Sequence, residues 1–200
     1  MNLGFDIDNT ISDIEGELNK EAYNYALTLG KAPKNDKTDV VDINNDGKSW
    51  TEMYNFTNEE LKYFLKDIQE EIWEEAKIRE DAVMIIKKLK EEGNTIIIIT
   101  ARNEEFHDDP YNISATWLNK KGIVYDKLIV NARDKGDICK AEKIDVFVDD
   151  QLGNCLNISS KGIKTIRLTT DKTIYKGIIN CTTFKEIYEI INNKVNTKIK

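Results

Sequence analysis

The stretch MNLGFDIDNTIS (residues 1–12) joins a short strand pattern to two aspartates. Apolar side chains alternate with glycine and aspartate over residues 3–8, which is the two-residue period of a β-strand, and residues 9–10 then break the pattern. Asp6 and Asp8 are therefore expected where a strand ends and a turn begins. Two carboxylates this close repel each other unless a cation or a shared proton holds them. The pair accordingly indicates a functional site at the end of the first strand.

Outward from this strand, the second half of the chain alternates between apolar runs and helical patterns. The apolar, β-branched runs predict strands over residues 94–100, 126–131, 144–150, 163–169 and 178–181. Helices are predicted in the intervals, over residues 111–121, 135–142, 151–160 and 183–193. Continuously apolar strands that alternate with helices are typical of a parallel sheet covered on both faces. The sequence therefore predicts an α/β fold with a Rossmann-like parallel sheet.

Between the first strand and this alternating region, the sequence shows helical patterns and no strand pattern. Helices are predicted over residues 12–30, 49–76 and 80–93, and a polar segment separates the first two of these helices. The predicted organisation is an α/β core made of residues 1–12 and 78–200, with a helical unit inserted over residues 13–77.

Two features of the inserted unit have more than one interpretation. Four large aromatic residues could stack on a nucleobase or form the core that a small helical unit needs, and the core interpretation is favoured for most of them: Trp50, Tyr54, Phe56 and Trp73. Residues 42–53 begin like a calcium-binding loop, but the twelfth position is Met53 and not the required glutamate. A turn rich in aspartate and asparagine is therefore favoured over a calcium site.

The composition excludes several classes of protein. Two hundred residues with 40% apolar side chains suffice for one domain, or for one domain with an insert. The formal charge of −7 argues against binding to nucleic acid polymers, whose phosphates attract basic surfaces. The longest apolar run, Ile96–Ile99, is too short to cross a membrane. Three widely spaced cysteines and the lack of a signal peptide predict a soluble, cytoplasmic protein.

The residues that follow the predicted strands form a chemically distinctive set. In open α/β sheets, ligands bind beyond the carboxyl ends of the strands, so these residues share one rim. The rim is expected to hold two acids, a hydroxyl group with an arginine, an ammonium group and a second pair of acids: Asp6 and Asp8, Thr100 and Arg102, Lys135, and Asp149 with Asp150. Lys140 is an alternative to Lys135, but it is expected to point away from the rim.

Phosphoryl transfer is the chemistry that uses this whole set. Mg²⁺ prefers oxygen ligands, and Asp6, Asp149 and a backbone carbonyl can hold it. A carboxylate beside the ion can attack phosphorus and form an aspartyl-phosphate, and a second acid then protonates the leaving oxygen. Lys135 and the Thr100 hydroxyl can neutralise and orient the phosphate oxygens.

Four short segments carry a resemblance to a known family. The segments DIDNT, ITAR and VFVDD, together with Lys135, resemble the four motifs of the haloacid dehalogenase superfamily of phosphohydrolases. The helical insert resembles that superfamily's type-1 cap in size and helicity. Within the superfamily, the chain most resembles the 5'(3')-deoxyribonucleotidases and related bacterial nucleotidases. The resemblance covers essentially the whole chain.

This resemblance implies that Asp6 is the nucleophile and Asp8 the general acid and base. Mg²⁺ is expected to be held by Asp6, Asp149 and the main-chain carbonyl of Asp8, with Asp150 close by or bound through a water. Asn9 departs from the superfamily, which commonly has glycine there, and is interpreted as a feature of the nucleotidase-like branch. The presence of Asp8 argues against dehalogenation, because dehalogenases lack an acid at that position.

The resemblance also implies that Thr100 and Lys135 bind phosphate, and it leaves Arg102 open between a substrate contact and a surface ion pair. His107, the only histidine, is interpreted as a loop residue. The expected function is a Mg²⁺-dependent phosphomonoesterase for a small phosphorylated substrate, preferably a nucleoside monophosphate. A phosphatase for a sugar phosphate or another small metabolite is the alternative, and a non-catalytic nucleotide- or metal-binding module is less favoured. The oligomeric state stays open, and a homodimer is one of the states allowed.

Overall fold

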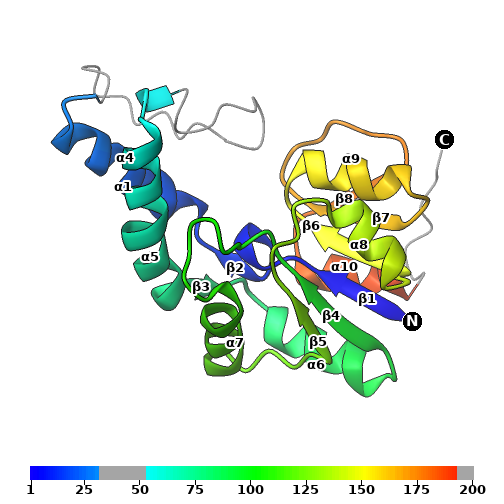
Figure 1. The fold of residues 1–200 in the computed structure, drawn as a ribbon. Helices are drawn as coiled ribbons and strands as arrows, with labels where there is room; N and C mark the ends of the chain where they lie inside the picture. Colours follow the sequence, from blue (N-terminus) through cyan, green and yellow to red (C-terminus); the bar gives the residue numbers. More distant parts are fainter. Residues whose placement is uncertain (32–52, 193–200) are drawn as a thin grey trace.

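The protein is known from a computed structural model, which describes residues 1–31 and 53–192 (Figure 1). Trp50 and nearly all of the calcium-like loop lie outside the described residues. The main sheet is built from β1 (Asn2–Phe5), β4 (Thr95–Ile99), β5 (Lys127–Ile129), β6 (Val146–Asp149), β7 (Lys164–Leu168) and β8 (Ile178–Cys181). All six strands are parallel, in the order β5-β4-β1-β6-β7-β8. The predicted α/β fold with a parallel sheet is confirmed.

Helices cover both faces of this sheet. One face packs against α6 (Ala82–Glu91), α7 (Pro110–Lys120) and α10 (Phe184–Ile191), and the other against α8 (Lys135–Ala141) and α9 (Leu152–Ser160). Strand β4 packs against helices on both faces of the sheet, because residues 96 and 98 belong to one core cluster and residues 97 and 99 to the other. Burial on both faces explains why its isoleucine run is continuous and does not alternate with polar residues. Within residues 1–31 and 53–192, no helix combines the length and apolar character that a membrane span requires.

A second group of helices lies beside the sheet, in the part of the chain between β1 and β4 (Figure 1). It comprises α1 (Glu15–Thr28), α4 (Asn58–Tyr63), the helical segment Phe64–Ile68 and α5 (Gln69–Glu75). These helices have a small apolar cluster of their own, which consists of Ala22, Ala26, Tyr54, Phe56 and Phe64. Trp73 on α5 is buried in the main core instead. The core interpretation of the aromatic residues is therefore confirmed for the three that the structure describes.

The chain enters and leaves this helical group through a short antiparallel ladder, formed by β2 (Ser12–Asp13) and β3 (Lys77–Ile78). Neither strand is predicted from the sequence, because two residues are too few to show a period. The prediction of one helix over residues 49–76 is wrong, because the helix is interrupted at Asn55, which has a left-handed φ of 53°. Helix α4 then begins behind Thr57, which forms a capping box with Glu60.

Candidate active site

The end of β1 places Asp6 at the rim of the sheet. The Asp6 N–H donates to the Val148 carbonyl at 3.0 Å, which extends the pairing of β1 with β6 by one residue. The chain then turns through Ile7–Ile11, where Asn9 has a left-handed φ of 58°. Glycine and asparagine adopt this conformation more readily than other residues. The turn therefore accounts for asparagine at the position where the haloacid dehalogenase superfamily commonly has glycine.

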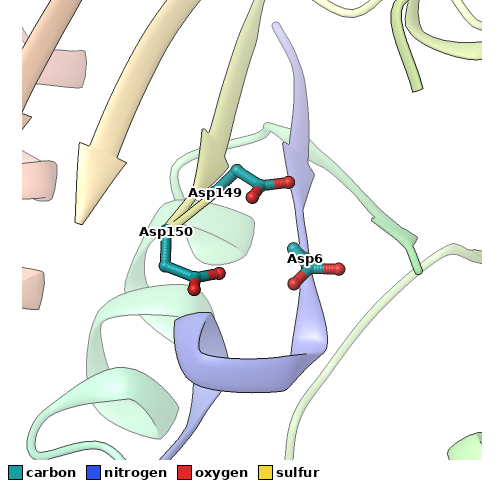
Figure 2. A group of neighbouring side chains, drawn as sticks. All are labelled: Asp6, Asp149 and Asp150. Atoms are coloured by element: carbon teal, nitrogen blue, oxygen red, sulfur yellow. The ribbon is translucent and has the colours of Figure 1, made fainter. Parts of the chain in front are cut away.

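Three buried carboxylates converge at the ends of β1 and β6 (Figure 2). Asp6, Asp149 and Asp150 each offer one carboxylate oxygen, and these oxygens lie within 4.8 Å of one another. The Lys135 ammonium group donates to Asp6 Oδ1 and to Asp149 Oδ2, at 2.7 Å in both cases. With every group ionised, three negative charges and one positive charge leave a net charge of −2 on the cluster. Because buried charge is costly unless it is paired, the cluster favours a further cation.

The pKa values of Asp6, Lys135 and Asp150 are shifted by burial and by the neighbouring charges. Burial raises the pKa of Asp6 from 3.8 to about 7; Lys135 opposes this shift, whereas Asp149 and Asp8 add to it. Burial would lower the pKa of Lys135, but Asp149 and Asp6 together hold that pKa above its ordinary value. Burial also raises the pKa of Asp150 well above its ordinary value. The Lys135 charge is thus held by two carboxylates, those of Asp6 and Asp149, which share it.

Neighbouring groups fix other oxygens of the cluster. The Asn154 side-chain amide donates to both oxygens of Asp149, at 3.3 and 3.2 Å, and the Thr10 hydroxyl donates to Asp150 Oδ1 at 3.2 Å. Adjacent side chains within a strand point to opposite faces, but Asp150 follows the last residue of β6 and is not bound by this alternation. The carboxylates of Asp149 and Asp150 therefore both lie on the side of Asp6 (Figure 2). An all-oxygen set of this kind can hold an oxygen-preferring divalent cation such as Mg²⁺.

Helix α8 presents Lys135 to the cluster from its first residue. The next residue, Gly136, donates its N–H to Asn157 Oδ1 at 2.6 Å, at a place where a Cβ atom would collide with Asn157. Glycine thus allows α8 to lie directly against α9. Lys135 is 2% exposed, whereas Lys140 in the same helix is exposed. The structure therefore brings Lys135, and not Lys140, to the carboxylates.

A cavity of about 210 Å³ opens beside the cluster. Most of the predicted rim residues line it, namely Asp6, Asp8, Thr100, Lys135 and Asp150. Glu15 and Leu18 of α1 also line the cavity, so the helical group contributes one wall. The site is therefore bounded by charged groups at the sheet and by a mixed surface on the insert.

Arg102 lies next to this cavity, but it is not among the residues that line it. Its Nε donates to Asp8 Oδ2 at 3.0 Å and its Nη2 to Asp8 Oδ1 at 2.7 Å, which makes a two-point contact with the carboxylate. The Arg102 side chain is fully buried, and that of Asp8 is 26% exposed. Of the two alternatives left open for Arg102, the ion pair is present, but its arginine is buried and does not lie at the surface. The expected contact between Arg102 and phosphate stays a prediction.

Two residues without a predicted role at the site adjoin this pair. The Trp73 ring lies 4.0 Å from the Arg102 guanidinium carbon, and the His107 ring lies 4.4 Å from the Trp73 ring. His107 is in a loop, as expected, but it is 4% exposed and its Nδ1 is 2.8 Å from Glu70 Oε1. Burial lowers the pKa of His107, and Glu70 opposes this shift. No local sequence pattern signals these contacts, because they join segments that are far apart in the chain.

Among known proteins, likenesses span the whole chain, although no protein-family model matches it. A nucleotidase of Clostridium acetobutylicum is 28% identical over 196 residues, which is 96% of this chain and 94% of that protein. The protein named "Putative nucleotidase YqfW" of Bacillus subtilis is 28% identical over 207 residues, which is 100% of this chain and 98% of that protein.

Solved structures share the fold at low sequence identity. A haloacid dehalogenase-like hydrolase of Streptococcus pneumoniae superposes with a TM-score of 0.65 at 11% identity, covering 95% of this chain and 97% of that one. The magnesium-bound "putative HAD-hydrolase YfnB" of Bacillus subtilis gives a TM-score of 0.63 at 15% identity, covering 96% and 98%. The relatives named nucleotidases support a phosphoric monoester hydrolase, and the solved structures show the fold. The chain thus has the fold of haloacid dehalogenase superfamily hydrolases and resembles nucleotidases in sequence.

Proposed function

We propose that the protein is a Mg²⁺-dependent phosphomonoesterase that uses Asp6 as its nucleophile and acts on nucleoside monophosphates. The observation that carries this proposal is the convergence of three strand-end carboxylates, two of which share the Lys135 ammonium group, beside a cavity that Asp8 and Thr100 also line. The carboxylates fit an oxygen-preferring cation, and the lysine and the hydroxyl fit phosphate oxygens.

The cation site is proposed to use Asp6, Asp149, Asp150 and the main-chain carbonyl of Asp8. When bound, Mg²⁺ would neutralise the excess negative charge of the cluster and allow a phosphate dianion to approach Asp6. Lys135 and Thr100 would bind phosphate oxygens. The Lys135 contact with Asp6 also orients the nucleophilic carboxylate.

Two transfers complete the reaction. In the first, an Asp6 oxygen forms a bond to phosphorus, the bond between phosphorus and the substrate oxygen breaks, and a proton from Asp8 passes to the departing alcohol. In the second, a water oxygen attacks phosphorus, Asp8 takes the water proton, and the bond between Asp6 and phosphorus breaks. Inorganic phosphate leaves, and both aspartates return to their starting states. Each proton and each electron pair is thus accounted for by these two side chains, the substrate and water.

The choice of nucleotides as substrates is supported by the relatives that are named nucleotidases. The groups at the sheet bind phosphate and not the leaving alcohol, so a sugar phosphate or another small metabolite would use the same chemistry. The insert, including Glu15 and Leu18 at the cavity wall, is where the alcohol would be distinguished. The cytoplasmic location, the insert boundaries at residues 13 and 77 and a homodimeric state stay predictions from the sequence.

The test is phosphate release from a panel of deoxynucleotides, ribonucleotides and sugar phosphates, with Mg²⁺ and with a chelator. Mg²⁺-dependent release that favours nucleoside monophosphates is expected from the wild type, and none from Asp6→Asn. Release from sugar phosphates alone would keep the mechanism and replace the substrate. Release that persists in the chelator, or in Asp6→Asn, would contradict the proposed chemistry. No release from any ester would favour a non-catalytic binding module.

A further inference from the structure

The Arg102 guanidinium lies between the predicted general acid and a helix of the insert. On one side it makes the two-point contact with the Asp8 carboxylate, at 3.0 and 2.7 Å. On another side its central carbon lies 4.0 Å from the Trp73 ring on α5. Its Nη1 also donates to the Ser114 hydroxyl on α7, at 3.4 Å. A buried guanidinium with these partners has little freedom to move, and so the Asp8 carboxylate that it contacts is held as well.

The Trp73 indole is buried in the main core and contacts two polar side chains. It packs against the Arg102 guanidinium and against the ring of His107, which in turn contacts Glu70 on α5. Trp73 Nε1 is buried and has no hydrogen-bond partner among the residues that the structure describes. The indole therefore contributes a cation–π contact to Arg102, an interaction that is strongest for tryptophan.

We infer that Arg102 is a positioning residue for Asp8, and that Trp73 makes this positioning depend on the place of α5 in the insert. The inference rests on the proposed function, because it assigns to Arg102 the orientation of the acid in that reaction. Two parallel hydrogen bonds fix the plane of the Asp8 carboxylate as well as its distance, which a single contact cannot do. When Asp8 gives its proton to the leaving alcohol, it becomes an anion that already faces a fixed guanidinium.

This role predicts a dependence on the leaving group that a merely structural role does not. Phenyl phosphate and p-nitrophenyl phosphate are similar in shape, but the p-nitrophenolate leaves readily without a proton, whereas phenolate benefits from one. The value of kcat/KM reports the steps up to release of the alcohol. Proton donation by Asp8 belongs to these steps, so kcat/KM is sensitive to it. The ratio of the two kcat/KM values also cancels any difference in the fraction of folded enzyme, because both esters are measured on one preparation.

The experiment compares this ratio, phenyl over p-nitrophenyl, in the wild type and three variants. Arg102→Lys keeps the charge but loses the two-point contact, so its ratio is expected to fall at least about tenfold. Trp73→Phe removes no hydrogen bond of a described residue and weakens the cation–π contact with Arg102, so a smaller fall of about threefold is expected. Trp117→Phe is the matched control on α7: it loses a bond from Nε1 to the Ala76 carbonyl at 3.3 Å, yet its ratio is expected to stay unchanged.

A double variant separates positioning from general damage to the site. In an Asp8→Asn background the acid is absent, so Arg102→Lys is expected to leave the ratio unchanged. Equal losses on both esters in Arg102→Lys, or a further fall of the ratio in the double variant, would overturn the inference. An unchanged ratio in Arg102→Lys would overturn it as well. A wild type that hydrolyses neither of these esters nor any member of the substrate panel would instead refute the proposed function, and the two failures are thereby distinguished.

Discussion

Asp6 and Asp8 are two residues apart, and their surroundings differ in origin. Asp6 lies among groups from the α/β core: Lys135 at the start of α8 and the two acids at the end of β6. Asp8 contacts Arg102, whose guanidinium packs against a tryptophan of the insert. The proposed nucleophile is therefore surrounded by groups of the α/β core, whereas the proposed acid is held by an arginine that also contacts the insert.

The difference suggests a division of labour within the proposed reaction. The groups around Asp6 handle phosphate and the cation, which are the same for every phosphomonoester, so a rigid arrangement at the strand ends suits them. The groups around Asp8 act on the leaving alcohol, which varies from one substrate to another. Contact with the insert would link proton donation to the part of the molecule that meets that alcohol.

The largest expected effect separates the two aspartates by their place in the reaction. With p-nitrophenyl phosphate, Asp6→Asn is expected to lose more than about 1,000-fold in rate and to show no burst, because no phosphoryl acceptor remains. Asp8→Asn is expected to release up to one equivalent of p-nitrophenolate per enzyme and then to slow, because phosphoryl transfer proceeds but the water lacks its base. Rapid-mixing absorbance measurements at high enzyme concentration would record both.

The controls for this comparison are wild type and the double variant Asp6→Asn/Asp8→Asn. The wild type should turn over without a pause, and the double variant should behave as Asp6→Asn alone. A burst of p-nitrophenolate in Asp6→Asn would contradict the division of roles. So would a slow steady rate without a burst in Asp8→Asn.

A large effect on stability is expected at the lysine that the carboxylates share. Lys135→Met leaves the carboxylates of the cluster without their buried ammonium group, and removing one partner of a buried ion pair costs about 3–5 kcal/mol. Urea unfolding at pH 8 in a chelator measures the free energy of unfolding. Lys140→Met, on the exposed face of the same helix, is the control and should change it by less than about 0.5 kcal/mol. Similar values for the two variants would show that Lys135 does not carry the cluster's charge balance.

A moderate effect concerns pH, through the pKa of Asp6, which burial raises from 3.8 to about 7. Between these values the native state keeps a proton that the unfolded state has lost, so metal-free stability falls as pH rises from about 4 to about 7. Asp6→Asn has no carboxyl group to ionise at this position, so its stability is not expected to fall in this way. In a chelator, its melting temperature is expected to exceed that of the wild type increasingly over this range, by about 2–4 °C for each kcal/mol.

The pH series has its own control in added Mg²⁺. Saturating Mg²⁺ is expected to stabilise the wild type more than Asp6→Asn, because the variant lacks one carboxylate ligand, and the order of the two melting temperatures should then reverse. Parallel curves for the two proteins from pH 4 to pH 8 in the chelator would show that the ionisation of Asp6 does not oppose folding.

The same comparison explains how far the sequence could predict this molecule. The α/β fold and the strand ends could be predicted because parallel strands buried on both faces are apolar throughout, and their carboxyl ends share one rim. Lys135 could be chosen over Lys140 because the start of a helix after a strand points to that rim. In each of these cases a local pattern and a topological rule suffice.

The surroundings of Asp8 could not be predicted in this way. Arg102 follows a strand end, but its partner depends on how a loop folds back onto the turn after β1. Trp73 and His107 meet through the packing of the insert on the core, and a tryptophan in an amphipathic helix has the same local pattern whether it packs against leucine or against a guanidinium. The short ladder of β2 with β3, at the two ends of the insert, is not predictable for a similar reason, because its strands are defined by pairing and not by a period.

The smallest expected effect tests which neighbour holds Arg102. Ser114 accepts from Arg102 Nη1 at 3.4 Å and donates to the Pro110 carbonyl at 2.7 Å, so its hydroxyl is mainly engaged with its own helix. Ser114→Ala should cost about 1 kcal/mol in stability and lower the ratio of phenyl to p-nitrophenyl phosphate kcat/KM by less than about threefold. A long, neutral hydrogen bond contributes less to orientation than two charged bonds to a carboxylate. If Ser114→Ala instead lowered the ratio as far as Arg102→Lys does, α7 would position the arginine, and Asp8 would be independent of the insert.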